Sequence, residues 1–127
     1  REQLSEVAVN IWLSSPILGA GVNNFIIEAA DQILIGPSRF LQPVHNIFLL
    51  SLAETGIVGL SGFLGLIGYP IYRIIKFPIS NFQSPILLIW GVIIFLGLFD
   101  HYFLTLPQGY RLLFLLWGIS FAIIPLK

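Results

Sequence analysis

A histidine, an asparagine and a glutamate mark the start of a long apolar segment, in the stretch PVHNIFLLSLAETG (residues 43–56). His45 and Asn46 precede the apolar run, and Glu54 lies inside it. An imidazole can take up a proton near neutral pH, and an asparagine can cap a helix. A carboxylate within an apolar helix needs a partner or a proton. These three side chains are the first candidates for chemistry, although His45 and Asn46 could equally serve only the helix start.

Three further ionisable residues accompany the later apolar segments. Asp100 and His101 lie late in the second segment, and Arg111 opens the third. Charged groups at membrane depth are costly and usually face a cavity or a partner. We expect these residues to enclose a polar pocket together with His45. For Asp100, a structural ion pair with Arg111 across the turn is favoured over a direct catalytic role.

The sequence contains no pattern for a metal or cofactor site. There is no cysteine, no HExxH motif, no aspartate pair suited to Mg²⁺ and no serine in a GxSxG elbow. The formal net charge is zero, so no basic field favours nucleic acid. We therefore expect no metal, no cofactor and no nucleic-acid partner.

The composition indicates a membrane protein. Of the residues, 57% are hydrophobic and only 9% are charged, whereas typical soluble domains carry about 25% charged residues. Three apolar segments follow one another, over residues 47–72, 85–106 and 110–125. The first would reach roughly 39 Å as a helix, enough for a hydrocarbon core of about 30 Å. The sequence predicts an all-α integral membrane protein with about three transmembrane helices, which together form a transmembrane region over residues 46–127.

Residues 1–45 are predicted to form a loop outside the membrane with one or two short helices. Apolar residues recur at helical spacing and predict an amphipathic helix over residues 2–14, with a second short helix around residues 25–33. Gly19-Ala20-Gly21 resembles part of a phosphate-binding loop, but a plain turn is the favoured interpretation.

Cationic residues suggest the orientation of the segments. Arg73 and Lys76 follow the first segment and Lys127 follows the third, and such charges favour the cytoplasmic side. Residues 1–45 and the turn at 107–109 would then lie outside. Within the first segment glycines recur every third residue from position 56 to 68, a spacing that lets helices approach closely in lipid.

Several motifs resemble the C-terminal part of the O-antigen ligase/polymerase superfamily of membrane glycosyltransferases. They are the glycine turn SPILGAGVNNF, the HN pair with the following ETGIVG, and the later DHYFLT and QGY. The matching positions of the first two motifs and the preceding helix are Arg1, Pro16, Gly19, Gly21, Phe25, His45, Asn46, Glu54, Gly56 and Gly59.

This resemblance implies glycan transfer from an isoprenoid diphosphate carrier to a sugar hydroxyl on a lipid- or glycan-linked acceptor, at the outer face of the bacterial cytoplasmic membrane. The implied reaction inverts the anomeric centre and uses no metal. His45 would be the general base, a role typically worth about 10²–10⁴-fold in rate. Arg1, with Arg39 or Arg111, would bind the diphosphate, because a guanidinium group suits phosphate oxygens.

Under the same interpretation, Asn46, Glu54, Asp100 and His101 support the site. Members of the superfamily have many more spans, and the chain does not begin with methionine. We therefore expect it to be a piece of a longer, multi-pass inner-membrane enzyme and to be inactive alone. A transporter or flippase of lipid-linked glycans, or a structural membrane subunit, is the alternative. The sequence does not distinguish a ligase from a polymerase.

Overall fold

The computed structural model describes residues 2–32, 42–77 and 83–122, and all the regular elements in these ranges are α-helices. This confirms the all-α prediction for the part of the chain that is described. The helices are α1 (Glu2–Ser14), α2 (Phe25–Gln32), α3 (Ile47–Lys76), α4 (Gln83–Gly97), α5 (Tyr102–Thr105) and α6 (Pro107–Ala122).

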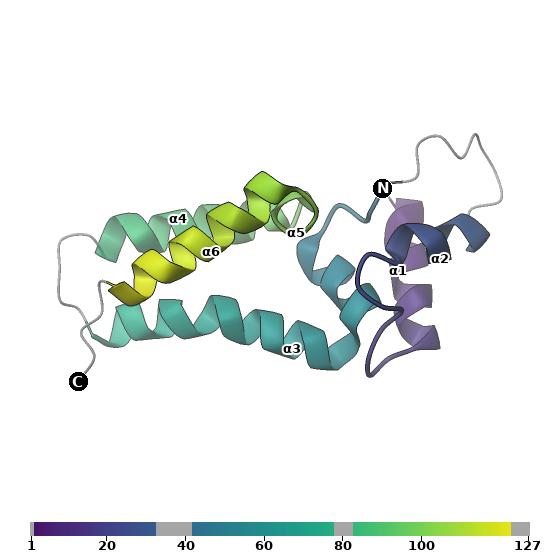
Figure 1. The fold of residues 1–127 in the computed structure, drawn as a ribbon, viewed down its shortest axis with the longest axis horizontal. Coiled ribbons are helices and arrows are strands. Elements are labelled where there is room, and N and C mark those ends of the chain that lie inside the picture. The colour runs from purple at the N-terminus through teal and green to yellow at the C-terminus, as the bar shows by residue number, and fades with distance from the viewer. Residues whose placement is uncertain (1, 33–41, 78–82, 123–127) are drawn as a thin grey trace.

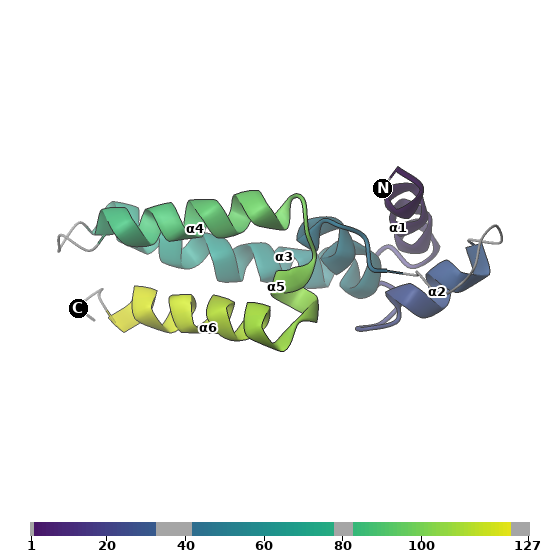
Figure 2. The same cartoon turned by 90° about the horizontal axis from the view of Figure 1, so that it is seen from above.

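The helices form two groups that meet near the start of α3. The long part of α3 runs beside α4 and α6 as an elongated bundle, and α1 and α2 gather at one end of it (Figures 1 and 2). The short helix α5 connects α4 to α6 at that same end. The junction between the two groups is therefore built from the start of α3, the end of α4 and α5.

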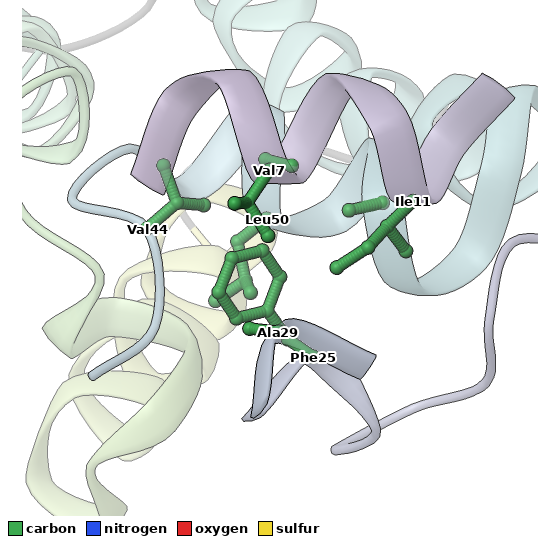
Figure 3. Close-up of a cluster of buried hydrophobic side chains, with 8 residues drawn as sticks. Val7, Ile11, Phe25, Ala29, Val44 and Leu50 are labelled. Carbon is green, nitrogen blue, oxygen red and sulfur yellow. The ribbon is translucent and has the colours of Figure 1, made fainter. Parts of the chain in front are cut away.

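The first group has its own hydrophobic core, which we call the N-terminal cluster. Val7 and Ile11 of α1 face α2 and the start of α3, as Figure 3 shows. Ile11 is among the side chains that are almost fully buried, and burying such a side chain contributes about 1.5–3 kcal/mol. The full cluster is Val7, Ala8, Ile11, Phe25, Ala29, Val44, Leu50 and Ala53.

The bundle has a second core that joins α3, α4 and α6. Trp90 of α4 is at its centre and is 1% exposed. Its indole Nε1 donates a hydrogen bond of 3.0 Å to the buried hydroxyl of Ser120, so the polar atom of this large side chain is satisfied. The buried members of this core are Ile67, Ile74, Ile86, Trp90, Ile93 and Leu116.

The long helix α3 is broken at Gly56. This residue has φ 63° and ψ −166°, a backbone conformation that is essentially restricted to glycine. Figure 1 shows the first turns of α3 at an angle to the remainder. The part after the break, residues 57–76, is about 30 Å long at 1.5 Å per residue.

The loop between α1 and α2 supplies the hydrogen bonds that the break leaves unmade. On one side of the break, Ala20 and Gly21 donate their backbone N–H groups to carbonyls of α3. On the other side, α3 donates two N–H groups back to loop carbonyls. The four bonds are Ala20 N to Ala53 O (3.0 Å), Gly21 N to Glu54 O (2.8 Å), Ile57 N to Pro16 O (3.0 Å) and Val58 N to Ile17 O (3.3 Å).

The contact between loop and helix requires glycine on both sides. Gly19 has φ 70°, and a Cβ atom there would collide with the backbone of Glu54. A Cβ atom at Gly56 would collide with the carbonyl of Ile17. Because the amides of this loop already bind α3, the phosphate-loop alternative considered for residues 19–21 is excluded.

The apolar segments differ from the predicted helices in two respects. α3 is the one described helix that is long and apolar enough, by length and composition, to cross a membrane. The second predicted helix, over residues 85–106, does not continue to its end: α4 stops at Gly97, where backbone N–H groups begin to bond three residues back, as in Phe99 N to Leu96 O (2.9 Å). The end of the third predicted span, residues 123–125, lies outside the described residues.

The glycine stripe of α3 does not mediate helix contacts among the described residues. A Cβ atom added at Gly62, Gly65 or Gly68 would meet no atom within 4 Å. The described helices therefore leave this part of the stripe uncovered, and a close approach of another membrane helix there stays a prediction.

Candidate functional site

His45 stands at the junction of the two helical groups. It follows Val44, which is buried in the N-terminal cluster, and it precedes the first residue of α3 by two positions. The residue lines a cavity of about 220 Å³. The other lining residues come from α1, the start of α3 and the end of α4: Ser5, Asn46, Leu49, Leu98 and Phe99. A half-buried imidazole therefore opens onto a small cavity between three helices.

Asn46 fixes the start of α3 beneath this histidine. Its Oδ1 accepts hydrogen bonds from the backbone N–H groups of Phe48 and Leu49, both 2.9 Å. Its Nδ2 donates to the carbonyl of Leu98 at 3.3 Å. The N-cap interpretation is correct, and the amide also ties α3 to the end of α4 across the cavity.

Replacing Asn46 with alanine should lower the free energy of unfolding by about 0.5–2 kcal/mol, because the first N–H groups of α3 lose their acceptor. Asn46→Asp is the matched control, since it keeps the acceptor and loses only the bond to Leu98. We expect the melting temperature of the purified protein in detergent to fall clearly for the alanine variant and less for the aspartate. If the alanine variant and the wild type had the same melting temperature, Asn46 would not stabilise α3 as an N-cap.

His45 lies against a second imidazole. The ring centroids of His45 and His101 are 5.2 Å apart, with an angle of 58° between the ring planes. His101 is 8% exposed, and Nδ1 of His45 is buried without a hydrogen-bond partner. The sequence placed these residues at one end of the spans but gave no sign of a ring contact.

His101 is held by its immediate neighbours. Its Nδ1 is 2.7 Å from the hydroxyl of Thr105, and that hydroxyl donates to the His101 carbonyl at 3.1 Å. Asp100 accepts from the backbone N–H of His101 at 2.7 Å. Burial lowers the pKa of His101 below its ordinary value of 6.5. The nearby Asp100 carboxylate raises this pKa, and the neighbouring His45 lowers it further. Burial therefore favours the neutral form of His101, which lies between α4 and α6.

Glu54 is engaged elsewhere, at the break in α3. Its Oε1 accepts a hydrogen bond of 3.3 Å from the backbone N–H of Phe25, the first residue of α2. A carboxylate is favourable at a helix N-terminus, where the backbone presents partial positive charge. Glu54 does not line the cavity of His45. Its carboxylate joins α2 to α3 and so helps to position the helix that begins beside His45.

The three arginines expected at the site are described only in part. Arg111 lies in α6 and is exposed. It forms no ion pair with Asp100, so the favoured interpretation, a structural ion pair between these two described residues, is wrong. Arg1 and Arg39 lie outside the described residues.

Five residues of the site were not predicted from the sequence: Ser5, Leu49, Leu98, Phe99 and Thr105. Ser5 is not part of the apolar repeat of α1, so the pattern gave no reason to expect it at the site. Thr105 follows His101 by four positions, and that spacing brings side chains together on a helix. Within the described ranges, no three side chains of histidine, aspartate or glutamate gather as metal ligands would.

The comparison with known protein families gives one finding. A family model described as O-antigen ligase matches residues 1–64, just over half of the chain. The match includes α1, the loop that binds the break of α3, α2 and the start of α3 with His45. No curated protein and no solved structure matches the chain.

Proposed function

The chain belongs to the O-antigen ligase family, and from this membership we propose that it carries the general base of a membrane glycosyltransferase. Membership implies a bacterial, membrane-associated enzyme of the O-antigen ligase or polymerase type, acting on lipid-linked glycans in polysaccharide biosynthesis. The proposal names the reaction more closely: a glycan moves from an isoprenoid diphosphate carrier to a sugar hydroxyl of a lipid- or glycan-linked acceptor.

The surface of the helical bundle supports a membrane location. α3 has the length and composition of a membrane-crossing helix. Large apolar side chains are exposed on all three helices of the bundle, among them Leu64 on α3, Phe95 on α4 and Phe114 on α6. Extensive exposed apolar surface is unusual in soluble monomers but suits contact with lipid or with further membrane helices. We propose that α3, α4 and α6 lie within the membrane.

The proposed orientation places His45 at the extracytoplasmic end of α3. Arg73 and Lys76 lie in the last turn of α3, at the opposite end of the bundle from His45, and cations close to a span favour the cytoplasmic side. Asp100 and His101 lie at the same end of the bundle as His45. The two histidines and Asp100 are gathered at this end, which favours an enzyme acting at the membrane surface over a transporter with a site at mid-membrane.

The observation that carries the proposal is the half-buried imidazole of His45 at the cavity between α1, α3 and α4. Because Nδ1 of this ring is buried, we assign the proton transfer to Nε2. The acceptor hydroxyl gives its proton to Nε2 while its oxygen attacks the anomeric carbon of the donor glycan. The bond from that carbon to the diphosphate oxygen breaks, and the electron pair leaves with the diphosphate. Attack opposite to the leaving group inverts the anomeric centre.

The departing diphosphate gains negative charge that must be neutralised. A guanidinium group binds phosphate oxygens through two parallel N–H donors. Arg111, exposed in α6, is available for this role. We propose that Arg1 and Arg39, which the structure does not describe, act with it. In this scheme the chain uses no metal, because arginines supply the positive charge.

Deleting the gene from its host and examining the surface glycan tests the proposed function. A polymerase predicts accumulated single repeat units, and a ligase predicts long chains that remain on the lipid carrier. Electrophoresis of the glycans, with the gene supplied on a plasmid as control, distinguishes the two. Unchanged glycan, or donor trapped on the cytoplasmic face as for a lost flippase, would overturn the proposal.

A further inference from the structure

We propose that His101 accepts a hydrogen bond from the general base His45: in the working enzyme, Nε2 of His101 binds the hydrogen on Nδ1 of His45. This inference rests on the proposed role of His45. It assigns to His101 the task of a positioning residue, which holds the tautomer and the direction of the base without touching the substrate.

The hydrogen bonds around Thr105 determine which nitrogen of His101 carries the hydrogen. The Thr105 hydroxyl has one hydrogen, and it donates this to the carbonyl of His101 at 3.1 Å. The same oxygen lies 2.7 Å from Nδ1 of His101. With the hydroxyl hydrogen on the carbonyl, Nδ1 of His101 is the donor in the second bond, and this is the tautomer that we assign. In neutral His101 the hydrogen is then on Nδ1, and Nε2 has a free lone pair.

The buried nitrogen of His45 supplies the matching donor. Nδ1 of His45 is buried and has no hydrogen-bond partner, and a buried polar atom without a partner is unfavourable. The neighbouring ring is His101, with a centroid separation of 5.2 Å. Because a ring nitrogen lies about 1.2 Å from its centroid, two nitrogens that face each other would be about 2.8 Å apart, a hydrogen-bond distance. The separation of the centroids is therefore compatible with a hydrogen bond between rings that have turned to face each other.

This hydrogen bond would prepare His45 for proton transfer. With its hydrogen on Nδ1, neutral His45 presents the lone pair of Nε2 to the cavity, where the acceptor hydroxyl is proposed to bind. After the transfer, the imidazolium keeps its Nδ1 hydrogen bonded to His101, and no proton leaves His45 in this step. Burial favours the neutral form of His101, which can accept a hydrogen bond. Asp100 and His45 are the titratable groups that act on its pKa.

Two substitutions in the intact protein separate this role from simple packing. His101→Phe retains a ring of similar size but cannot accept a hydrogen bond, whereas His101→Gln offers a neutral oxygen acceptor at a similar reach. We expect the phenylalanine variant to lower kcat about 10–100-fold, by analogy with the loss of groups that orient metal-binding histidines. The KM values for donor and acceptor should not change, and the glutamine variant should recover most of the rate.

The outcomes distinguish this inference from the proposed function. If His45→Ala is inactive but His101→Phe is fully active, only the role of His101 is overturned. Equal loss in the phenylalanine and glutamine variants, with normal protein levels, would also overturn it, because packing alone would then explain the defect. If His45→Ala remains active, the general base itself is wrong.

A spectroscopic measurement decides the question even if the variants do not accumulate. Solid-state NMR of the ¹⁵N-histidine-labelled wild-type protein in lipid reports which ring nitrogen carries hydrogen. We expect both His45 and His101 to be protonated at Nδ1 at pH 7.5, with the Nδ1 hydrogen of His45 in a hydrogen bond to nitrogen. A His101 ring protonated at Nε2 would overturn the inference.

Discussion

Replacing His45 with alanine should reduce glycan transfer by about 10²–10⁴-fold, the contribution of a positioned general base. The ring lies at a cavity formed by α1, α3 and α4, and we expect it to take the proton of the acceptor hydroxyl there. The variant should accumulate normally, because His45 is only half-buried and forms no hydrogen bond that holds the fold. The measurement is the rate of transfer by the purified protein, from a lipid-linked donor, at saturating substrate.

A charged residue far from the cavity provides the control for this experiment. Lys76 lies in the last turn of α3, is exposed, and contacts the hydroxyl of Tyr72 at 2.7 Å. Lys76→Gln should leave the transfer rate close to that of the wild type. Normal transfer by His45→Ala, or equal losses in both variants, would show that the imidazole is not the base.

Replacing Gly56 with alanine should have the largest effect on the fold. A non-glycine residue in this backbone conformation is strained by about 1–3 kcal/mol, and the new Cβ would also collide with the carbonyl of Ile17. The loop between α1 and α2 would have to leave the break in α3. We expect a loss of more than about 3 kcal/mol in stability, visible as a low level of protein in the membrane and an early melting transition.

Gly62→Ala is the matched control for this prediction. Gly62 lies in the same helix, and a Cβ atom there would meet nothing within 4 Å. Alanine is favoured over glycine in a helix by roughly 0.5–1 kcal/mol, so this variant should melt at the wild-type temperature or above it. Similar melting of both variants would contradict the account of the break.

Local patterns were sufficient to predict the regular elements of the first half of the chain. Residues 2–14 have an apolar repeat of helical period, and α1 has these bounds. The repeat also indicated the face that is buried, since Val7, Ala8 and Ile11 are its buried residues. Periodicity succeeds here because a single helix buries one face against the rest of the protein.

The interruptions of the helices could not be predicted from local patterns. α3 breaks at Gly56 because a loop more than thirty residues earlier in the chain supplies its hydrogen bonds, as between Gly21 and Glu54. α4 ends at Gly97 although apolar residues continue, because Leu98 and Phe99 turn toward the cavity and the amide of Asn46 binds the Leu98 carbonyl. Both interruptions depend on contacts between distant segments.

The candidate site could be predicted in outline only. Residue type and position along the predicted spans were enough to select His45 as a site residue and Asn46 as a helix cap. They also placed His101 at the same end of the spans as His45. The contact between the two imidazoles depends on the turn after α4 and on α5. Neither could be predicted, because apolar residues continue through both. The assignment of Arg1, Arg39 and Arg111 to the diphosphate stays a prediction.

Chemical rescue of His45→Ala by imidazole is the most direct test of the central claim. If the missing ring is a proton acceptor in the cavity, free imidazole should restore transfer in proportion to its concentration. The restored rate should rise with pH as imidazole loses its proton, near pH 7. A His45→Ala protein that transfers glycan at the wild-type rate without imidazole would contradict the claim.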